Sequence, residues 1–240
     1  MNFKENINIL WFRNGLRLHD NESLKIAAGD EICKLLPIFI FDGETPTRND
    51  KYNKISFLLE CIEDLDTQFF FCGGKVNLVE GNPVEVFKAL SKQFSIRRLC
   101  FDQNSEPVWL DRDNAVKSYC RTQRIEVFES ISQTLWDPLE VIQVHGGRPP
   151  LSYREFCQVA QSIGPPPTPL ADVDLSNISF LHLESYPNLL ASLTVFPDVP
   201  KPSMLGIDWE GGEEKIYRGG EKQALKYFAR RIRPVCSTPC

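Results

Sequence analysis

The chain has 240 residues, of which 42% are hydrophobic and 25% are charged, as is typical of a soluble globular protein. Its net charge of -5 at pH 7 gives no overall attraction for nucleic acid, which argues against DNA binding. No apolar run reaches membrane-spanning length, and the first residues lack the order of a signal peptide. We therefore expect neither membrane insertion nor export.

Short apolar runs alternate with helical patterns as far as residue 130. Five of these runs predict strands, at residues 7–12, 35–41, 76–79, 99–101 and 125–128. Strands that alternate with helices predict right-handed crossovers and a five-stranded parallel sheet with helices on both faces. The fold class is therefore α/β, Rossmann-like or flavodoxin-like. Five strands favour the flavodoxin-like order, and ligands of such sheets favour the carboxyl edge where strand order reverses.

Local signals place several helices. Apolar residues between positions 55 and 65 recur on one helical face. Asn82 as cap and Pro83 at the first helical position predict the start of another helix. Ser152 and Glu155 form a capping-box pattern, in which each side chain satisfies a free backbone N–H of the other.

The chain divides into four predicted regions. Residues 5–131 form the α/β core, and residues 132–164 form a closing loop and helix. Residues 165–219 are rich in proline and have little sustained periodicity, which predicts an interdomain linker or a segment that wraps the surface. Residues 220–240 contain a last helix that begins near Glu221.

The cysteines predict thiols rather than a metal site or a disulfide framework. The eight cysteines form no C-x-x-C pair, and the three histidines are far apart, whereas zinc needs clustered ligands. Only Cys236 and Cys240, near the end of the chain, are expected to react. The other six lie singly in apolar or periodic segments, which predicts buried free thiols: Cys33, Cys61, Cys72, Cys100, Cys120 and Cys157.

Polar side chains gather directly after the first predicted strand. They are Arg13, Arg17, His19, Asp20 and Asn21. These groups could line a ligand cleft where strand order reverses. Alternatively, Asp20 or Asn21 caps the next helix and Arg17 pairs with a carboxylate, and we favour this interpretation. The single glycine of the loop, Gly15, excludes a dinucleotide fingerprint.

Glu106 and His145 are two further candidates for ligand or catalytic chemistry. Glu106 follows the fourth strand and would face the first loop, where it could accept hydrogen bonds from an aromatic heterocycle. It could equally be a first-turn acid that the helix dipole favours, and this is the preferred interpretation. His145 lies in a turn rich in glycine and proline without a nucleophile elbow. The sequence thus predicts no catalytic residue.

Basic residues dominate positions 215–233, where Glu221 is the single acid. Such a basic helix face could bind a phosphate or diphosphate. A solvated helix face explains the same run, and from the residues alone we favour it.

Four motifs resemble, in order, the N-terminal α/β domain of the photolyase/cryptochrome family. They are residues 11–21 (WFRNGLRLHDN), 39–42 (FIFD), 136–138 (WDP) and 149–153 (PPLSY). The resemblance covers about residues 7–232. Residues 15–21 with 134–138 resemble the branch of animal cryptochromes and 6-4 photolyases. Residues 162–169 are most similar to the insect-type, light-sensing cryptochromes.

The resemblance implies a blue-light photoreceptor that binds FAD, regulates the circadian clock through clock proteins, and is found in cytoplasm and nucleus. It is not expected to be an enzyme. The alternative is the N-terminal antenna domain of a 6-4 DNA photolyase, which repairs DNA with light. In both, flavin chemistry belongs to a second, helical domain. The missing phosphate loop argues against a third possibility, a free-standing nucleotide-binding module.

Two site residues follow from the resemblance. Arg231 matches an arginine that approaches the flavin phosphates, and Glu106 matches the region where some photolyases contact a folate antenna. The insect-type branch is not known to need an antenna, so neither folate nor deazaflavin is expected. After residue 232 the likeness stops, which predicts a truncated isoform. Residues 220–240 are then the truncated start of the FAD-binding domain, and the chain is not expected to bind FAD stably.

Overall fold

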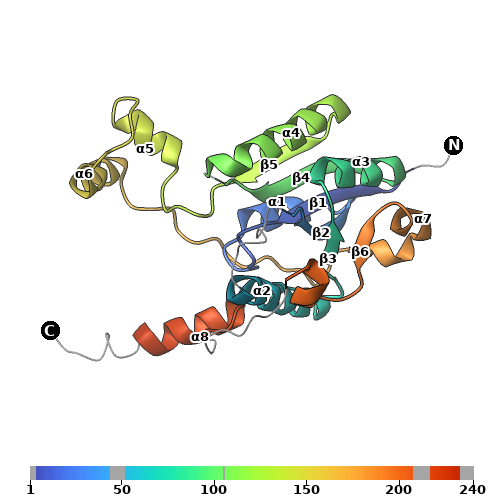
Figure 1. Ribbon diagram of the computed structural model, residues 1–240. Coiled ribbons are helices and arrows are strands. Elements are labelled where there is room, and N and C mark those ends of the chain that lie inside the picture. The colour runs from blue at the N-terminus through green and yellow to red at the C-terminus, as the bar shows by residue number, and fades with distance from the viewer. Residues whose placement is uncertain (1–3, 44–51, 105, 208–216, 233–240) are drawn as a thin grey trace.

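The computed structural model of the chain describes residues 4–43, 52–104, 106–207 and 217–232 (Figure 1). Its strands are β1 (Asn6–Phe12), β2 (Lys34–Phe41), β3 (Asn77–Glu80), β4 (Ser95–Asp102), β5 (Glu126–Ser130) and β6 (Thr194–Phe196). They form one sheet in the order β5-β4-β1-β2-β3-β6, in which β6 alone of these strands is antiparallel to its neighbour. The α/β fold class is therefore confirmed.

The sheet differs from the prediction in two respects. All five predicted strands are present and mutually parallel, but the sheet of the described residues has a sixth strand and is mixed. Strand β6 escaped prediction because three residues are too few to show an alternating pattern. The parallel strands follow the order β3-β2-β1-β4-β5, which is the Rossmann order and not the flavodoxin-like order.

Helices begin where the local signals predict. The helices are α1 (Glu22–Ala28), α2 (Tyr52–Phe70), α3 (Pro83–Gln93), α4 (Pro107–Gln123), α5 (Pro138–Val144), α6 (Tyr153–Ile163), α7 (Pro187–Leu190) and α8 (Glu221–Ile232), with short 3-10 turns η1 (Leu183–Ser185) and η2 (Pro202–Leu205). Asn82 accepts hydrogen bonds from the backbone N–H groups of Val84 and Glu85. Both bonds of the capping box between Ser152 and Glu155 are made at the start of α6. These predictions are confirmed.

Helices cover both faces of the sheet because the central strand is apolar on both sides. Ile7, Ile9 and Trp11 of β1 pack with α3 and α4 in one cluster of buried residues. Leu10 and Phe12 point to the opposite face and pack with α1 and α2. A parallel strand that is buried on both faces reads as a continuous hydrophobic run, as β1 does.

Residues 178–197, which we call the strap, run beside the start of β2 and then supply β6, which pairs with β3. Leu35 N–H donates to Ser179 O (2.8 Å), and Leu181 N–H donates to Leu35 O (2.9 Å). The buried Asn77 side chain accepts from Leu183 N (3.0 Å) and donates to Leu181 O (3.3 Å). The strap is thus bonded into the core, which matches a surface-wrapping segment better than a free linker.

The described cysteines are free thiols, as predicted, but the predicted burial is confirmed for only three of the six. Cys33, Cys100 and Cys120 are buried, whereas the remaining three are partly exposed: Cys61, Cys72 and Cys157. Burial raises the pKa of Cys100 to about 12 and that of Cys120 to about 11, so these two thiols stay protonated at neutral pH. Cys236 and Cys240 lie outside the described residues.

Two helical segments extend away from the sheet. Helices α5 and α6 pack on each other and lie apart from the sheet in Figure 1. Trp136, just before α5, connects this segment to α6. Its Nε1 donates to Gly164 O (3.1 Å), and its ring packs edge-on against Phe156 with 6.0 Å between the ring centres. Helix α8 starts beside α2 and projects towards the C-terminal end. None of the helices in the described ranges is both long and apolar enough to span a membrane.

Replacement of Asn77 tests the attachment of the strap. In Asn77→Ala, the backbone groups of Leu181 and Leu183 lose their buried partner, so we expect the free energy of unfolding to fall by about 2–4 kcal/mol. Urea denaturation followed by circular dichroism measures the change. Asn188→Ala, at an exposed position of α7, is the control and should change stability by less than about 0.5 kcal/mol. Equal effects in both variants would contradict the attachment.

Candidate functional site

The candidate site is the switch point of the sheet, where β1 and β4 lie side by side and their following helices leave to opposite faces. The loops after these two strands meet there, as the sequence predicted. The Arg13 guanidinium donates to Asp102 O, and a Cβ at Gly15 would lie 2.1 Å from Asp102 Oδ2. A side chain at this position would have to displace the Asp102 carboxylate, so glycine suits the close approach of the first loop to the end of β4.

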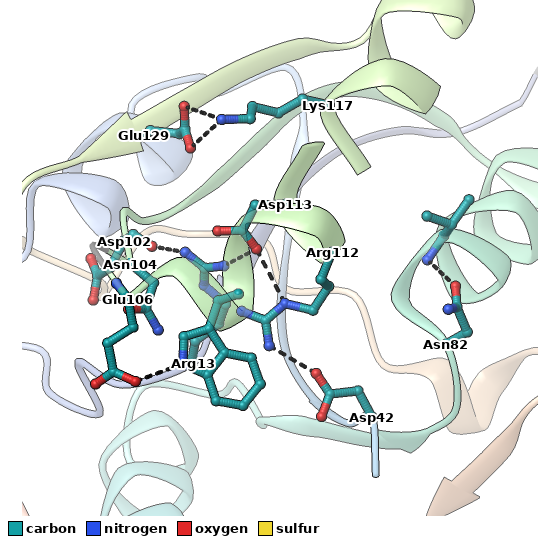
Figure 2. Close-up of polar contacts among 12 residues, drawn as sticks. Arg13, Asp42, Asn82, Asp102, Asn104, Glu106, Arg112, Asp113, Lys117 and Glu129 are labelled. Atoms are coloured by element: carbon teal, nitrogen blue, oxygen red, sulfur yellow. Dashed lines mark hydrogen bonds and ion pairs between the residues drawn. The ribbon is translucent and has the colours of Figure 1, made fainter. Parts of the chain in front are cut away.

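A chain of buried charges closes this edge. Figure 2 shows Arg13 and Arg112 turned towards Asp113, with Asp42 at the other end of Arg112. Asp113 Oδ1 accepts from Arg13 Nη1 (2.5 Å) and from Arg112 Nε (3.1 Å), and Arg112 Nη1 lies 2.8 Å from Asp42 Oδ2. The side chains of Arg13 and Asp113 are 5% and 3% exposed. Two guanidinium groups are thus balanced by two carboxylates.

Aromatic rings surround the same two arginines. The Arg13 guanidinium lies 4.9 Å from the ring centre of Trp11 and 4.6 Å from that of Phe101. The Arg112 guanidinium lies 4.6 Å from the ring centre of Trp109, so each cation faces π-systems as well as a carboxylate. Burial lowers the pKa of Arg13, while its hydrogen bond to Asp113 opposes that shift. An arginine remains protonated even so.

These side chains fill the space that a ligand would need. The cavity between them measures about 10 Å³, and its lining includes Trp11, Arg13, Asn104, Trp109 and Arg112. That volume accommodates about one water molecule. Pockets that bind an organic ligand are commonly about 300–1,000 Å³. In this conformation the switch point is therefore closed to a folate or a flavin ring.

Glu106 is hydrogen bonded to an aromatic heterocycle of the chain itself. Its carboxylate accepts from Trp109 Nε1 (3.3 Å), and its backbone N–H donates to Asn104 Oδ1 (3.1 Å). Glu106 is exposed and stands at the cap position of α4 without capping the helix through its side chain. Sequence reasoning missed Trp109, although a tryptophan three residues after Glu106 in a predicted first turn could have indicated the pair. The antenna role of Glu106 stays a prediction.

The remaining polar residues of the first loop have structural roles, as we favoured. Asn21 Oδ1 accepts from Leu24 N (2.9 Å) and caps α1, and Arg17 lies 3.7 Å from Asp20. His19 Nδ1 lies 2.8 Å from Asp172 Oδ1, at the rim of a second cavity of about 500 Å³. That cavity lies between the first loop, the end of α2 and the start of α8.

Arg231 is not part of either cavity. It lies on the exposed last turn of α8, beside the exposed Arg230. Lys222 and Lys226 of the same helix are exposed too, which fits a solvated basic face. The His145 side chain contacts its own turn, with Nδ1 2.8 Å from Arg148 O. In the described ranges, no three His, Cys, Asp or Glu side chains are placed to hold a metal ion.

Comparison with known proteins places this chain in one protein family. Residues 8–172 match the family described as DNA photolyase. The chain belongs to the photolyase/cryptochrome family. It is 42% identical to Cryptochrome-1 of Anopheles gambiae and 41% identical to Cryptochrome-1 of Drosophila melanogaster, in each case over 94% of this chain and 43% of the relative. It is 33% identical to the (6-4)DNA photolyase of Arabidopsis thaliana, over 93% of this chain and 41% of that relative. The insect-type likeness is thus confirmed.

Solved structures of this family share the fold. The cryptochrome of Synechocystis sp. PCC6803 superposes with a TM-score of 0.74 at 18% identity, over 97% of this chain and 48% of the other. An archaeal photolyase from Sulfolobus tokodaii, solved with two FAD molecules, gives 0.64 at 19% identity, over 92% of this chain and 45% of the other. FAD is thus a ligand of that archaeal photolyase, and the present chain spans less than half the length of these relatives.

Replacement of Asp113 tests the charge balance of the switch point. Asp113→Ala leaves the buried Arg13 without its carboxylate, so we expect the free energy of unfolding to fall by about 3–5 kcal/mol. Asp111→Ala removes an exposed acid from the same helix and should change stability by less than about 0.5 kcal/mol. Thermal and urea unfolding measure both. If Asp113→Ala lowers the free energy of unfolding by less than about 1 kcal/mol, the Arg13–Asp113 ion pair does not stabilise the switch point.

Proposed function

We propose that this chain is part of a cryptochrome-type blue-light photoreceptor that regulates the circadian clock through contacts with clock proteins in cytoplasm and nucleus. The observation that carries the proposal is the order of the identities. Three insect Cryptochrome-1 proteins match at 40–42%, whereas the plant (6-4)DNA photolyase matches at 33% and mammalian Cryptochrome-1 proteins at 33–34%. We also propose that the chain acts as part of a receptor and has no enzymatic activity of its own.

The closed switch point supports a receptor without an antenna. Arg13 and Arg112 occupy the carboxyl edge together with Trp109, and the remaining cavity of about 10 Å³ cannot admit folate or deazaflavin. The two arginines are also bonded to carboxylates of the chain, so moving them aside would break buried ion pairs. We infer that this edge is a structural element of the receptor.

FAD supplies blue-light absorption and electron transfer when it is bound in a member of this family. Of the described residues, Arg231 with Arg230 has the chemistry to meet a diphosphate, because guanidinium groups bind phosphate oxygens bidentately. Neither arginine lines the cavities described above, so the described residues do not fit the flavin ring. We infer that the 240-residue chain by itself does not retain FAD.

The second candidate is the antenna domain of a 6-4 DNA photolyase. The match to the Arabidopsis (6-4)DNA photolyase supports it, at lower identity. The net charge of -5 speaks against close contact with DNA. DNA binding by the purified chain, together with light-dependent loss of 6-4 photoproducts, would favour this candidate over the first.

Purification tests the flavin inference. We expect the 240-residue chain to elute from gel filtration without visible flavin absorbance, and added FAD to separate from it on the same column. If the chain binds pyrophosphate weakly, Arg231→Ala should reduce that binding, because it removes a guanidinium group. Arg148→Ala, at an exposed turn, should leave it unchanged. Stoichiometric FAD that stays with the chain would overturn the inference.

A binding experiment in light and darkness tests the receptor itself. In a protein that joins this chain to a flavin-binding domain, we expect stronger binding of a clock protein after blue light than in darkness. The reason is that light shifts the conformational equilibrium of the receptor. The 240-residue chain, without retained flavin, should bind equally in both. Repair of 6-4 photoproducts in place of light-dependent binding would favour the photolyase.

A further inference from the structure

The loop after β1 presents two successive backbone N–H groups to one carboxylate. Leu18 N–H donates to Glu221 Oε2 (2.9 Å), and His19 N–H donates to Glu221 Oε1 (3.0 Å). Each carboxylate oxygen thus receives one backbone donor, in the paired geometry that suits a carboxylate. Successive N–H groups that converge in this way form an anion-binding nest. The partners lie about two hundred residues apart in the sequence.

The nest is shaped by bonds that do not involve Glu221. Leu16 N–H donates to Asn14 O (3.1 Å), and Arg17 N–H donates to Gly15 O (3.0 Å). Asn21 Nδ2 donates to Arg17 O (2.9 Å) and ties the end of the loop to α1. The loop therefore holds its conformation through its own contacts, and the two N–H groups are preorganised for an acceptor.

A third donor and an open groove complete the site. Gln68 Nε2, from α2, lies 3.3 Å from Glu221 Oε2. The cavity of about 500 Å³ is lined by Leu18, His19, Gln68 and Glu221, and Lys222 adds a cation to its wall. Donors from two separate elements thus surround the carboxylate, and solvent reaches the site through the groove.

Helix α8 is held to the rest of the structure through its first turn. Gly219 N–H donates to Glu60 Oε2 (2.8 Å), and Lys222 N–H donates to Asp64 Oδ2 (3.2 Å), so side chains of α2 satisfy backbone groups at the start of α8. Residues 224–231 are exposed. A Cβ at Gly219 would lie 2.4 Å from Phe57 O, which explains glycine at this approach. The Glu221 carboxylate is therefore the contact that joins α8 to the loop after β1.

We propose that the backbone of Leu18 and His19, with Gln68, is a carboxylate-binding site, and that Glu221 is its internal ligand and the positioning residue of α8. The site uses neither Arg231 nor the switch point, so it stands independently of the proposed receptor function. Removal of the Glu221 side chain opens the nest to a carboxylate from solution through the groove.

Hydrogen exchange with chemical rescue tests the site on the full chain. In Glu221→Ala, we expect the amide protons of Leu18 and His19 to exchange at least about tenfold faster, because each loses a charge-assisted bond. Acetate should restore part of the protection, whereas acetamide, which is similar in size but uncharged, should not. The capped amides of Val84 and Glu85 in α3 serve as an internal reference and should not change.

Two variants complete the design. Glu22→Ala removes the exposed acid at the first position of α1, the place that Glu221 holds in α8, and should leave both amides unchanged. Glu221→Gln keeps the side-chain size but turns one acceptor into a donor. We expect faster exchange at one of the two amides and no response to acetate, because the glutamine still fills the site.

Three outcomes would overturn the proposal. They are unchanged exchange at Leu18 and His19 in Glu221→Ala, an equal response of that variant to acetate and acetamide, and an acetate response of the same size in Glu221→Gln. If Glu221→Ala does not fold, Glu221→Gln decides, since unchanged protection at both amides in that variant would contradict the proposed bonds.

Discussion

The carboxylate of Asp113 is the contact on which the centre of this structure depends. It accepts from Arg13 of the first loop and from Arg112 of its own helix, and all three groups are largely withdrawn from water. Burial of a guanidinium group costs several kcal/mol unless a partner compensates it. Since the partner of Arg13 lies a hundred residues later, this ion pair forms only when the loop after β1 and helix α4 are docked together.

This charge balance also fills the place in the sheet where a ligand would be expected. The carboxyl edge at a switch point is where open α/β sheets bind ligands. In this chain the same edge holds two arginines stacked on aromatic rings, and its volume is used up. The likeness to solved photolyases and cryptochromes, at 18–20% identity, therefore concerns the arrangement of strands and helices. What the edge can bind depends on Arg13, Arg112 and Trp109.

Sequence reasoning succeeded where the signal is local and failed where partners are distant. Asn82 and Ser152 could be assigned as caps because the groups they bind lie within three residues. The pairing of Arg13 with Asp113 could not be predicted, since no periodicity links positions so far apart. Strand β6 is defined by its pairing with β3 rather than by its own three residues. The nest around Glu221 was missed for a related reason, because backbone N–H groups leave no mark in a sequence.

Strand β6 has a further consequence for the behaviour of the chain in solution. Without it, β3 would present a row of unpaired backbone groups at the end of the sheet, and such an edge is a template for aggregation. The antiparallel pairing of Thr194–Phe196 with Leu78, Val79 and Glu80 covers that row. The new edge is only three residues long and is followed by Pro197, which has no N–H to donate. At the other end of the sheet, β5 carries Glu126 and Glu129, which form ion pairs with Arg98 and Lys117 and so make this edge strand polar.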